Sequence, residues 1–399
     1  MILLGAHYDH VGYGRKGNSY GPVGYIHNGA DDNASGVSGL LEIVDAVKRL
    51  PTPPKRSILF VLWDGEEAGL IGSRHWISRP TVPLSRIALC LNIDMIGRLK
   101  NQRVEVYGTR TLAGSRRLVS EANAAADLTF DFNWNVKADS DHHPFFAQGI
   151  PFLMLHTGLH ENYHRPSDDA NLLNLEGMQQ VTRVTLQTLL RYADGEELGK
   201  FRESSRQETE WHHQQMDQPQ EAQPPRFGLP WQRAAGNDLR IVLLQPTPGS
   251  PAEAAGLRAG DRLAKYDGAA ITDENLLRLQ LLGAAGKKAF VIEREGEKEP
   301  LEVTITPRGG PIRVGISWRE DPAEPGSVIL TQVIPGSAAA LAGLATRDRI
   351  YSLGGQRFAN GDELSKLMSS ASSPMDVIME RGGRLRMVKV ETLPVEKAP

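Results

Sequence analysis

Residues 57–67 read SILFVLWDGEE, an unbroken apolar run that is followed at once by a cluster of carboxylates. An apolar run without polar alternation is typical of a strand covered on both faces of a sheet. Further strand-like runs recur along the first 195 residues, and several of them are also apolar throughout. They are MILLGA (1–6), IALCLNI (87–93), RVEVYG (103–108) and PFLMLH (151–156). Together these runs predict a buried, largely parallel sheet.

Helical patterns separate the predicted strands. They are VSGLLEIVDAVKRL (37–50), SRRLVSEANAAA (115–126) and LEGMQQVTRVTLQTLLRYA (175–193). Strands that alternate with helices predict an α/β fold, here a mostly parallel mixed sheet with helices on both faces. The chain has 399 residues, which is too long for one compact domain.

The composition is that of an ordinary soluble globular protein, with 40% hydrophobic and 23% charged residues. The net charge of -3 gives no reason to expect nucleic acid or an anionic membrane as the main partner. The single cysteine, Cys90, excludes a disulfide within the chain, and its apolar neighbours predict a buried side chain. No apolar stretch approaches the ~20 residues that a membrane span needs.

Polar residues stand where the apolar strands end. The run 1–6 ends at His7, with Asp9 two residues on, the run 58–63 is followed by Glu66 and Glu67, and the run 87–93 ends at Asp94. Because the carboxyl ends of parallel strands share one edge of a sheet, we expect these side chains to converge.

An aspartate pair, Asp31 and Asp32, lies in GADDNASG (29–36), just before a predicted helix. Either aspartate alone would more often be a helix cap than a ligand. Several bare carboxylates in one crevice repel one another, and a divalent cation removes that conflict. Imidazole and carboxylate ligands together suit zinc, with manganese or cobalt as alternatives. The sequence lacks HExxH, which excludes a one-zinc peptidase of that type.

Six motifs appear in order: GAHYDHVG, GADDNASGVSGLLEI, FVLWDGEEAGLIGSR, LNIDMIGR, SDHHPFFAQGIP and NYHRPSDD. This set closely resembles the M28 family of metallo-aminopeptidases over residues 1 to about 193. The resemblance implies a mixed α/β sheet that carries two zinc ions and a bridging aspartate.

The resemblance also implies a role for individual residues. Asp31 would bridge the two ions, and the peptide bond from Asp31 to Asp32 would be cis. His7 and Asp94 would complete one ion site, and Glu67 and His164 the other. The remaining implied roles are the general base for Glu66 and orientation of the His7 imidazole for Asp9.

Other histidines receive lesser roles. The family's tyrosine–histidine pair matches Tyr163-His164, which selects His164 over His160 as the ligand. Asp141 and His142 would support the site without binding metal. The histidines expected to be structural or on the surface are His10, His27, His75 and His156.

The last part of the chain is an internal repeat. PGSPAEAAGLRAGDRL from Pro248 matches PGSAAALAGLATRDRI from Pro335, an offset of 87 residues. The same offset relates FGLPW (227–231) to VGISW (314–318). Both copies resemble bacterial PDZ domains, in which an extended peptide pairs beside the Φ-Gly-Φ loop. Pro230 lacks an N–H after the first loop, which predicts weaker binding by the first copy.

These patterns predict a domain organisation. The metallopeptidase-like domain covers 1–195, a polar linker covers 196–225, and the two PDZ-like domains cover 226–308 and 309–394. A strand at the very start of the sequence predicts that the first domain is incomplete at its N-terminus. The PDZ-coupled architecture favours, by analogy, a periplasmic or secreted protein.

The predicted function is that of a di-zinc aminopeptidase acting on peptides or proteins, with PDZ domains that bind C-terminal peptides or partner proteins. Two alternatives stay open. The first is a glutaminyl cyclase or another amide hydrolase of the same fold, because metal ligands alone do not separate these activities. The second is an inactive peptide-binding scaffold.

Overall fold

The computed structural model describes residues 1–195, 198–233 and 241–394. The chain forms two compact units. Of the described residues, the first unit contains those within 1–216 together with two short segments, 320–326 and 380–386. The second unit contains the described residues within 217–319, 327–379 and 387–394.

The first unit is built around a mixed sheet in the order β2-β1-β3-β6-β4-β5. Neighbouring strands are parallel except for β4 and β6. The strands are β1 (Ile2–His7), β2 (Ile58–Trp63), β3 (Leu89–Ile93), β4 (Arg103–Tyr107), β5 (Thr129–Asn133) and β6 (Phe152–His156). The helices are α1 (Gly36–Lys48), α2 (Ile71–Ser78), α3 (Ser115–Ala122), α4 (His142–Ala147), α5 (Leu175–Asp194) and α6 (Glu210–Met216).

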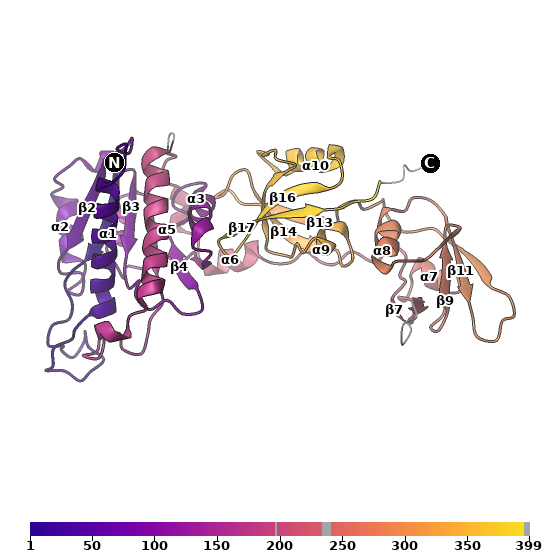
Figure 1. Cartoon of the computed structure of the whole chain (residues 1–399), viewed down its shortest axis with the longest axis horizontal. Coiled ribbons are helices and arrows are strands. Elements are labelled where there is room, and N and C mark those ends of the chain that lie inside the picture. The colour runs from indigo at the N-terminus through magenta and orange to yellow at the C-terminus, as the bar shows by residue number, and fades with distance from the viewer. Residues whose placement is uncertain (196–197, 234–240, 395–399) are drawn as a thin grey trace. The chain divides into compact units, whose positions relative to one another are not determined.

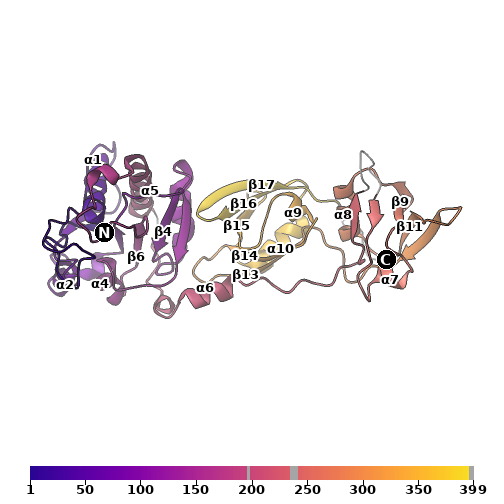
Figure 2. The same cartoon turned by 90° about the horizontal axis from the view of Figure 1, so that it is seen from below.

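Helices cover both faces of this sheet, which confirms the predicted fold class. On one face α1 and α5 lie side by side (Figure 1), and Leu40 of α1 and Val181 of α5 pack against Leu4 of β1. On the other face lie α2 and α4 (Figure 2), where Phe145 of α4 packs near the buried Cys90. Burial on both sides explains why β1 and β3 are apolar throughout.

The register of the sheet brings three strand ends together. β1 pairs with β2 on one side, where His7 lies opposite Trp63, and with β3 on the other. The chain segments that leave these three strands therefore begin at the same edge. This edge holds His7, the Glu66–Glu67 turn and Asp94.

The first unit extends beyond the predicted boundary at residue 195. The Phe201 ring lies 5.7 Å from that of Phe146, and the Glu208 carboxylate pairs with both Arg110 and Arg202. These contacts anchor a stretch that its polar composition had marked as linker. Residues 196 and 197 of the predicted linker lie outside the described residues.

The segments 320–326 and 380–386, which come from the second repeat in sequence, pack within the first unit. The Glu324 carboxylate accepts hydrogen bonds from the backbone N–H groups of Arg116 and Arg117, each 3.2 Å long, at the start of α3. The carbonyl of Gly382 accepts a 2.8 Å bond from the Phe130 N–H on β5, the last strand of the sheet. The two segments thus cap a helix and cover a sheet edge.

The second unit contains the first repeat and most of the second, and each repeat has its own antiparallel sheet. The first repeat comprises β7 (Trp231–Arg233), β8 (Ile241–Leu243), α7 (Pro251–Ala254), β9 (Arg262–Tyr266), β10 (Ala269–Ala270), α8 (Glu274–Gly283), β11 (Lys288–Glu293) and β12 (Leu301–Ile305). The second comprises β13 (Ile316–Glu320), β14 (Val328–Val333), α9 (Ala338–Leu341), β15 (Arg349–Leu353), α10 (Gly361–Ser370), β16 (Met375–Arg381) and β17 (Arg384–Val390).

One arginine in each repeat makes the same contacts, 87 residues apart. Arg226 donates hydrogen bonds to the carbonyls of Leu281, Leu282 and Ala284 at the end of α8. Arg313 donates to Met368, Ser369 and Ala371 at the end of α10. The offset found in the sequence therefore also relates the two helix ends in space.

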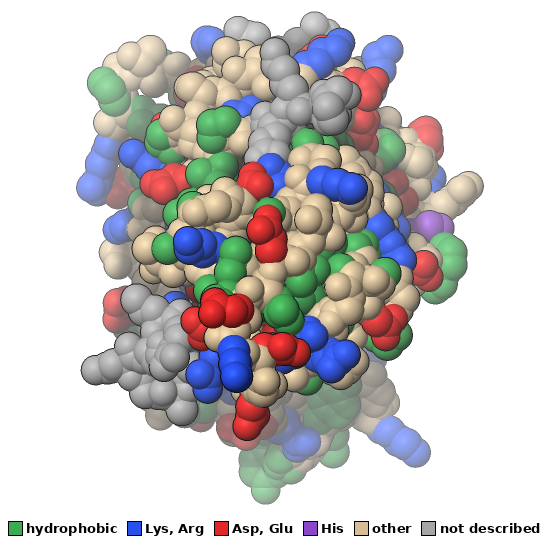
Figure 3. All heavy atoms as spheres, turned by 90° about the vertical axis from the view of Figure 1, so that its right-hand side faces the viewer, with side chains coloured by type: hydrophobic (Ala, Val, Ile, Leu, Met, Phe, Trp, Pro, Cys, Tyr) green, Lys and Arg blue, Asp and Glu red, His purple; other side chains and the backbone are tan. Residues whose placement is uncertain are grey.

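The surface charge and the polarity of the helices agree with the amino-acid composition. On the face drawn in Figure 3, acidic and basic side chains are interspersed with apolar ones, in keeping with a net charge of -3. Among the described residues, no helix combines the length and apolar character that crossing a membrane requires.

Candidate metal centre

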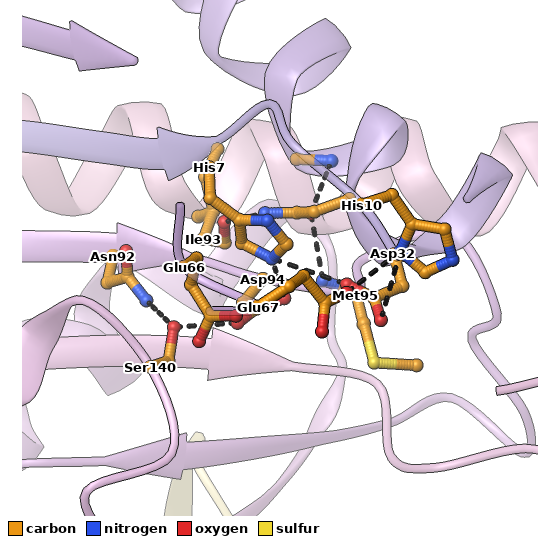
Figure 4. A network of polar contacts seen from close by, with 12 residues as sticks. His7, His10, Asp32, Glu66, Glu67, Asn92, Ile93, Asp94, Met95 and Ser140 are labelled. Atoms are coloured by element: carbon orange, nitrogen blue, oxygen red, sulfur yellow. Dashed lines mark hydrogen bonds and ion pairs between the residues drawn. The ribbon is translucent and has the colours of Figure 1, made fainter. Parts of the chain in front are cut away.

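Asp32 lies at the middle of a cluster of imidazoles and carboxylates (Figure 4). Its Oδ1 is 3.3 Å from His7 Nε2, and its Oδ2 is 3.1 Å from His164 Nε2. The Asp32 side chain is only 4% exposed. One carboxylate thus faces two sets of donor side chains, one with each oxygen.

The prediction that Asp31 takes this place needs correction. Asp31 is fully buried, and its Oδ1 accepts hydrogen bonds from the Gly97 N–H at 2.6 Å and from the Ser35 hydroxyl at 2.9 Å. These bonds turn Asp31 towards the chain that follows β3 and away from the cluster. The cis peptide bond also lies one residue later than predicted, between Asp32 and Asn33.

A residue distant in sequence fixes the backbone of the aspartate pair. Asp168 Oδ2 accepts the N–H groups of Asp31 at 2.8 Å and Asp32 at 3.1 Å. Asn33 completes the turn, since its Oδ1 accepts the Gly36 N–H at the start of α1. The small residue at position 36 is required there, because a Cβ would lie 2.3 Å from Asn33 Oδ1.

The first half of the cluster contains His7, Asp32 and Asp94. His7 Nε2 lies 3.4 Å from Asp94 Oδ1. The other oxygen of Asp94 accepts a 2.7 Å hydrogen bond from the Ser140 hydroxyl, which in turn accepts one from Asn92 (Figure 4). This chain of hydrogen bonds leaves Oδ1 of Asp94 turned towards His7.

The second half contains Asp32, Glu67 and His164. His164 Nε2 is 3.0 Å from Glu67 Oε2, and the Tyr163 ring stacks on the His164 ring at 3.9 Å. His160 lies elsewhere, with its Nε2 3.2 Å from Asp31 Oδ2. The structure therefore brings His164, and not His160, to Asp32 and Glu67.

Asp9 holds both the His7 imidazole and the glutamate turn. Its backbone carbonyl lies 3.1 Å from His7 Nδ1, whereas its carboxylate is farther away at 3.7 Å. The carboxylate instead accepts the backbone N–H groups of Glu66 at 3.0 Å and Glu67 at 3.2 Å. Asp9 thus orients His7 chiefly through its backbone, and it fixes the turn that carries both glutamates.

Burial and neighbouring charges shift the pKa values of the cluster. Burial would lower the pKa of His7, but the carboxylates of Asp94 and Asp32 raise it well above its ordinary value. Burial would likewise lower the pKa of His164, but Asp32 and Glu67 raise it to about 10. The Glu66 carboxyl is mostly buried, and burial raises its pKa to about 9. These shifts show a site with more carboxylates than its imidazoles can neutralise.

His10 also belongs to the second half, although the sequence placed it among structural or surface residues. Its Nδ1 is 2.8 Å from Glu67 Oε1. Ser140 and Asp168 were likewise missed as hydrogen-bond partners of the site.

Asp141 and His142 lie behind the site, where Asp141 accepts a hydrogen bond from Ser73 and the His142 ring stacks on Phe152. The sequence around a hydroxyl or carboxylate residue does not indicate which buried group that residue will contact.

The donor set fits divalent cations. Two groups of ligand-type side chains, His7–Asp32–Asp94 and His10–Asp32–Glu67, have donor atoms that all lie within 4.8 Å of one another in each group. Asp32 is common to both, and His164 reaches the second. Imidazole nitrogens mixed with carboxylate oxygens are the donors that zinc prefers.

Comparison with known proteins shows which family models and relatives these motifs match. The model of peptidase family M28 matches residues 1–189, and that of the PDZ domain matches residues 242–291 and 329–381. Aminopeptidase YwaD of Bacillus subtilis is 31% identical over 190 residues, which are 45% of this chain and 38% of the relative. Leupeptin-inactivating enzyme 1 of Streptomyces exfoliatus is 30% identical over 159 residues, which are 40% and 33% of the two chains. This chain thus spans only part of the length of these relatives.

Solved structures of other proteins also resemble part of this chain. The LapA aminopeptidase of Legionella pneumophila is 24% identical with a TM-score of 0.42, over 49% of this chain and 52% of the other. BSAP, a zinc aminopeptidase from Bacillus subtilis, is 25% identical with a TM-score of 0.39, over 49% and 47%. The sequence matches carry the comparison: residues 1–189 match the model of peptidase family M28, and two matches to the PDZ domain model follow them in the same chain.

Proposed function

We propose that this chain is a zinc-dependent aminopeptidase that binds two zinc ions and removes N-terminal residues from peptides or proteins. The observation that carries the proposal is the position of Asp32, which turns one oxygen to His7 and the other to His164. The M28 domain and its similarity to curated aminopeptidases support the same reading.

The positions of these residues define two proposed ion sites. His7, Asp94 and one oxygen of Asp32 would hold the first ion, and Glu67, His164 and the other oxygen of Asp32 the second. Bound zinc would polarise the scissile carbonyl and lower the pKa of a bound water. The excess of carboxylates over imidazoles would favour the binding of cations in this pocket.

Glu66 is the proposed general base. Its neighbour Glu67 is turned towards Asp32, whereas Glu66 lies on the side of Asp94 (Figure 4). Asp9 fixes the backbone of Glu66 by accepting its N–H. Glu66 takes a proton from the attacking water and delivers it to the nitrogen of the leaving amine, a role worth typically about 10²–10⁴-fold in rate.

Glu66→Gln tests this assignment. The variant should retain two zinc ions per chain but lose at least about 10²-fold in turnover of aminoacyl reporter substrates, because an amide cannot accept the proton. Glu161→Gln is the matched control, since Glu161 is exposed and is not part of the cluster. A Glu66→Gln variant that turns over at the wild-type rate contradicts the role of Glu66.

The same preparations separate the alternatives. Purified chain without zinc uptake or turnover would support a scaffold. Ring closure of N-terminal glutamine, without release of N-terminal residues from other peptides, would support a glutaminyl cyclase.

For the PDZ domains, we propose that the second binds extended C-terminal peptides more strongly than the first. In the first, Glu274 at the start of α8 accepts a 3.0 Å hydrogen bond from the Trp231 indole and pairs with Arg278, which also lies over the Trp231 ring. This cluster ties β7 to α8, the two elements beside the Φ-Gly-Φ loop. The residue 87 positions after Glu274 is Gly361, which has no side chain to make such a tie.

Fluorescence anisotropy with a labelled peptide pool tests this difference. Glu274→Ala should strengthen peptide binding to the first PDZ domain, and it should leave binding to the second unchanged. Glu253→Ala is the control, because this glutamate is exposed on α7 and lies outside the Trp231 cluster. If Glu274→Ala leaves all peptide binding unchanged, the cluster does not restrict the first domain.

A further inference from the structure

His10 is held beside the second half of the cluster on three sides. Its Nδ1 lies 2.8 Å from Glu67 Oε1, and its ring meets the His164 ring edge-on, with 5.6 Å between the ring centres. Only 11% of its side chain is exposed. The third side is formed by Gly29, where a Cβ would come within 2.8 Å of two carbons of the His10 ring. Gly29 also has a φ of 62°, a left-handed conformation that favours glycine.

The contact between His10 and Glu67 has the length of a hydrogen bond, 2.8 Å. In the imidazole tautomer that carries its hydrogen on Nδ1, His10 donates this bond to Oε1 of Glu67. An Nδ1 that donates a hydrogen has no lone pair left for a cation. The distance from Nδ1 to Asp32 Oδ2 is 3.8 Å, which also places His10 outside the closest ring of donors.

The two oxygens of Glu67 therefore have different partners. Oε1 faces His10, whereas Oε2 faces His164 at 3.0 Å on the side of Asp32. A carboxylate that is held at one oxygen offers the other in a fixed direction. Hydrogen bonds of this kind to metal ligands commonly affect metal affinity by about 10–100-fold.

We propose that His10 is a positioning residue that fixes Glu67 so that only Oε2 is presented to the second ion. This inference rests on the proposed di-zinc function. The role proposed for His10 follows from its contacts and not from its position in the sequence. It also explains why Gly29 precedes the aspartate turn, because a larger residue would displace the His10 ring.

The test compares His10→Ala with His10→Gln. Zinc affinity for each of the two sites is measured by competition with a chromophoric chelator, and thermal unfolding of the metal-free proteins is measured in parallel. His10→Ala should weaken the second site by about 10–100-fold and leave the first unchanged. His10→Gln should restore most of this affinity, because its amide N–H can donate to Glu67 Oε1. His75→Ala is the control, since His75 is an exposed histidine on α2 and is not part of the cluster.

Three results would overturn the proposal. The first is wild-type zinc affinity at both sites in His10→Ala. The second is an equal loss in His10→Ala and His10→Gln, and the third is an equal loss in His75→Ala, which would show a general effect of removing a histidine. Failure of the proposed function is recognised separately, because a wild-type chain that binds fewer than two zinc ions contradicts it, and the inference with it, before any variant is compared.

Discussion

Arg116→Met removes a charge pair that is buried within the first unit. The Arg116 guanidinium donates two hydrogen bonds, 2.9 and 3.2 Å long, to the carboxylate of Glu380. Glu380 is fully buried, and 14% of the Arg116 side chain is exposed. Met keeps the aliphatic packing beside the Phe132 ring but cannot replace the charge. The variant therefore removes the Arg116 guanidinium from a buried carboxylate, which keeps its other contacts, among them the Gly383 N–H.

The expected loss is large for a single substitution. Breaking a buried ion pair by removing one partner costs about 3–5 kcal/mol, because the remaining charge stays away from water. For a unit of this size the Tm falls by about 2–4 °C per kcal/mol, so a decrease of roughly 6–20 °C is expected. Scanning calorimetry of the metal-free chain measures it.

A neighbouring arginine provides the matched control. Arg117 is the next residue of α3, and its guanidinium pairs with Glu121 at 2.9 Å, with 25% and 32% of the two side chains exposed. Such a pair contributes only about 0.3–0.5 kcal/mol, so Arg117→Met should lower the Tm by about 2 °C at most. Equal Tm values for the two variants would refute the claim that 380–386 is an integral part of the first unit.

Three further predictions concern the site and the repeats. Asp168→Ala removes the acceptor of the Asp31 and Asp32 amides, so zinc affinity by chelator competition should fall by about 10–100-fold, whereas Asp168→Asn, which keeps an oxygen acceptor, should retain most of it. Unchanged affinity in Asp168→Ala would show that the turn holds itself. Because the pKa of His7 is well above its ordinary value and that of His164 is about 10, both imidazoles are protonated at pH 7 in the metal-free chain and must lose these protons to bind zinc. Zinc affinity should therefore rise with pH, and calorimetry in buffers of different ionisation enthalpy should detect release of about two protons or more; a heat independent of the buffer would contradict this. Arg226→Ala removes the donor to the carbonyls at the end of α8, each worth about 1–3 kcal/mol when left unpaired, so hydrogen exchange should quicken across 226–308 and not across 313–394, with Arg313→Ala giving the reverse pattern. Equal exchange in both repeats for either variant would contradict the separate anchoring of the two helices.

Much of the fold could be predicted because it depends on local patterns. Apolar runs such as 58–63 identify buried strands, and the rule that parallel strands end at one edge brings His7, Glu67 and Asp94 together without coordinates. The offset of 87 residues between the repeats could also be found in the sequence. It relates Arg226 to Arg313, and the two arginines make the same contacts.

The rest depended on contacts between distant residues. Asp31 and Asp32 have identical side chains, and their different orientations follow from the Asp168 acceptor and from the Gly97 amide. No local sequence pattern indicates which of the two aspartates will bind these partners. His10 was missed for the same reason, because its role comes from Glu67, 57 positions away in the sequence.

The boundaries of the sequence repeats do not coincide with the boundaries at which this chain can be truncated without loss of structural contacts. A truncation after residue 225, drawn from the repeats alone, would leave α3 without Glu324 and the end of the sheet without Gly382. Loss of activity in such a fragment would report a damaged scaffold and would say nothing about peptide capture. Chimeras and expression fragments of the M28-like domain should therefore carry the second PDZ domain with them, and swaps of the first are the safer route to altered recognition.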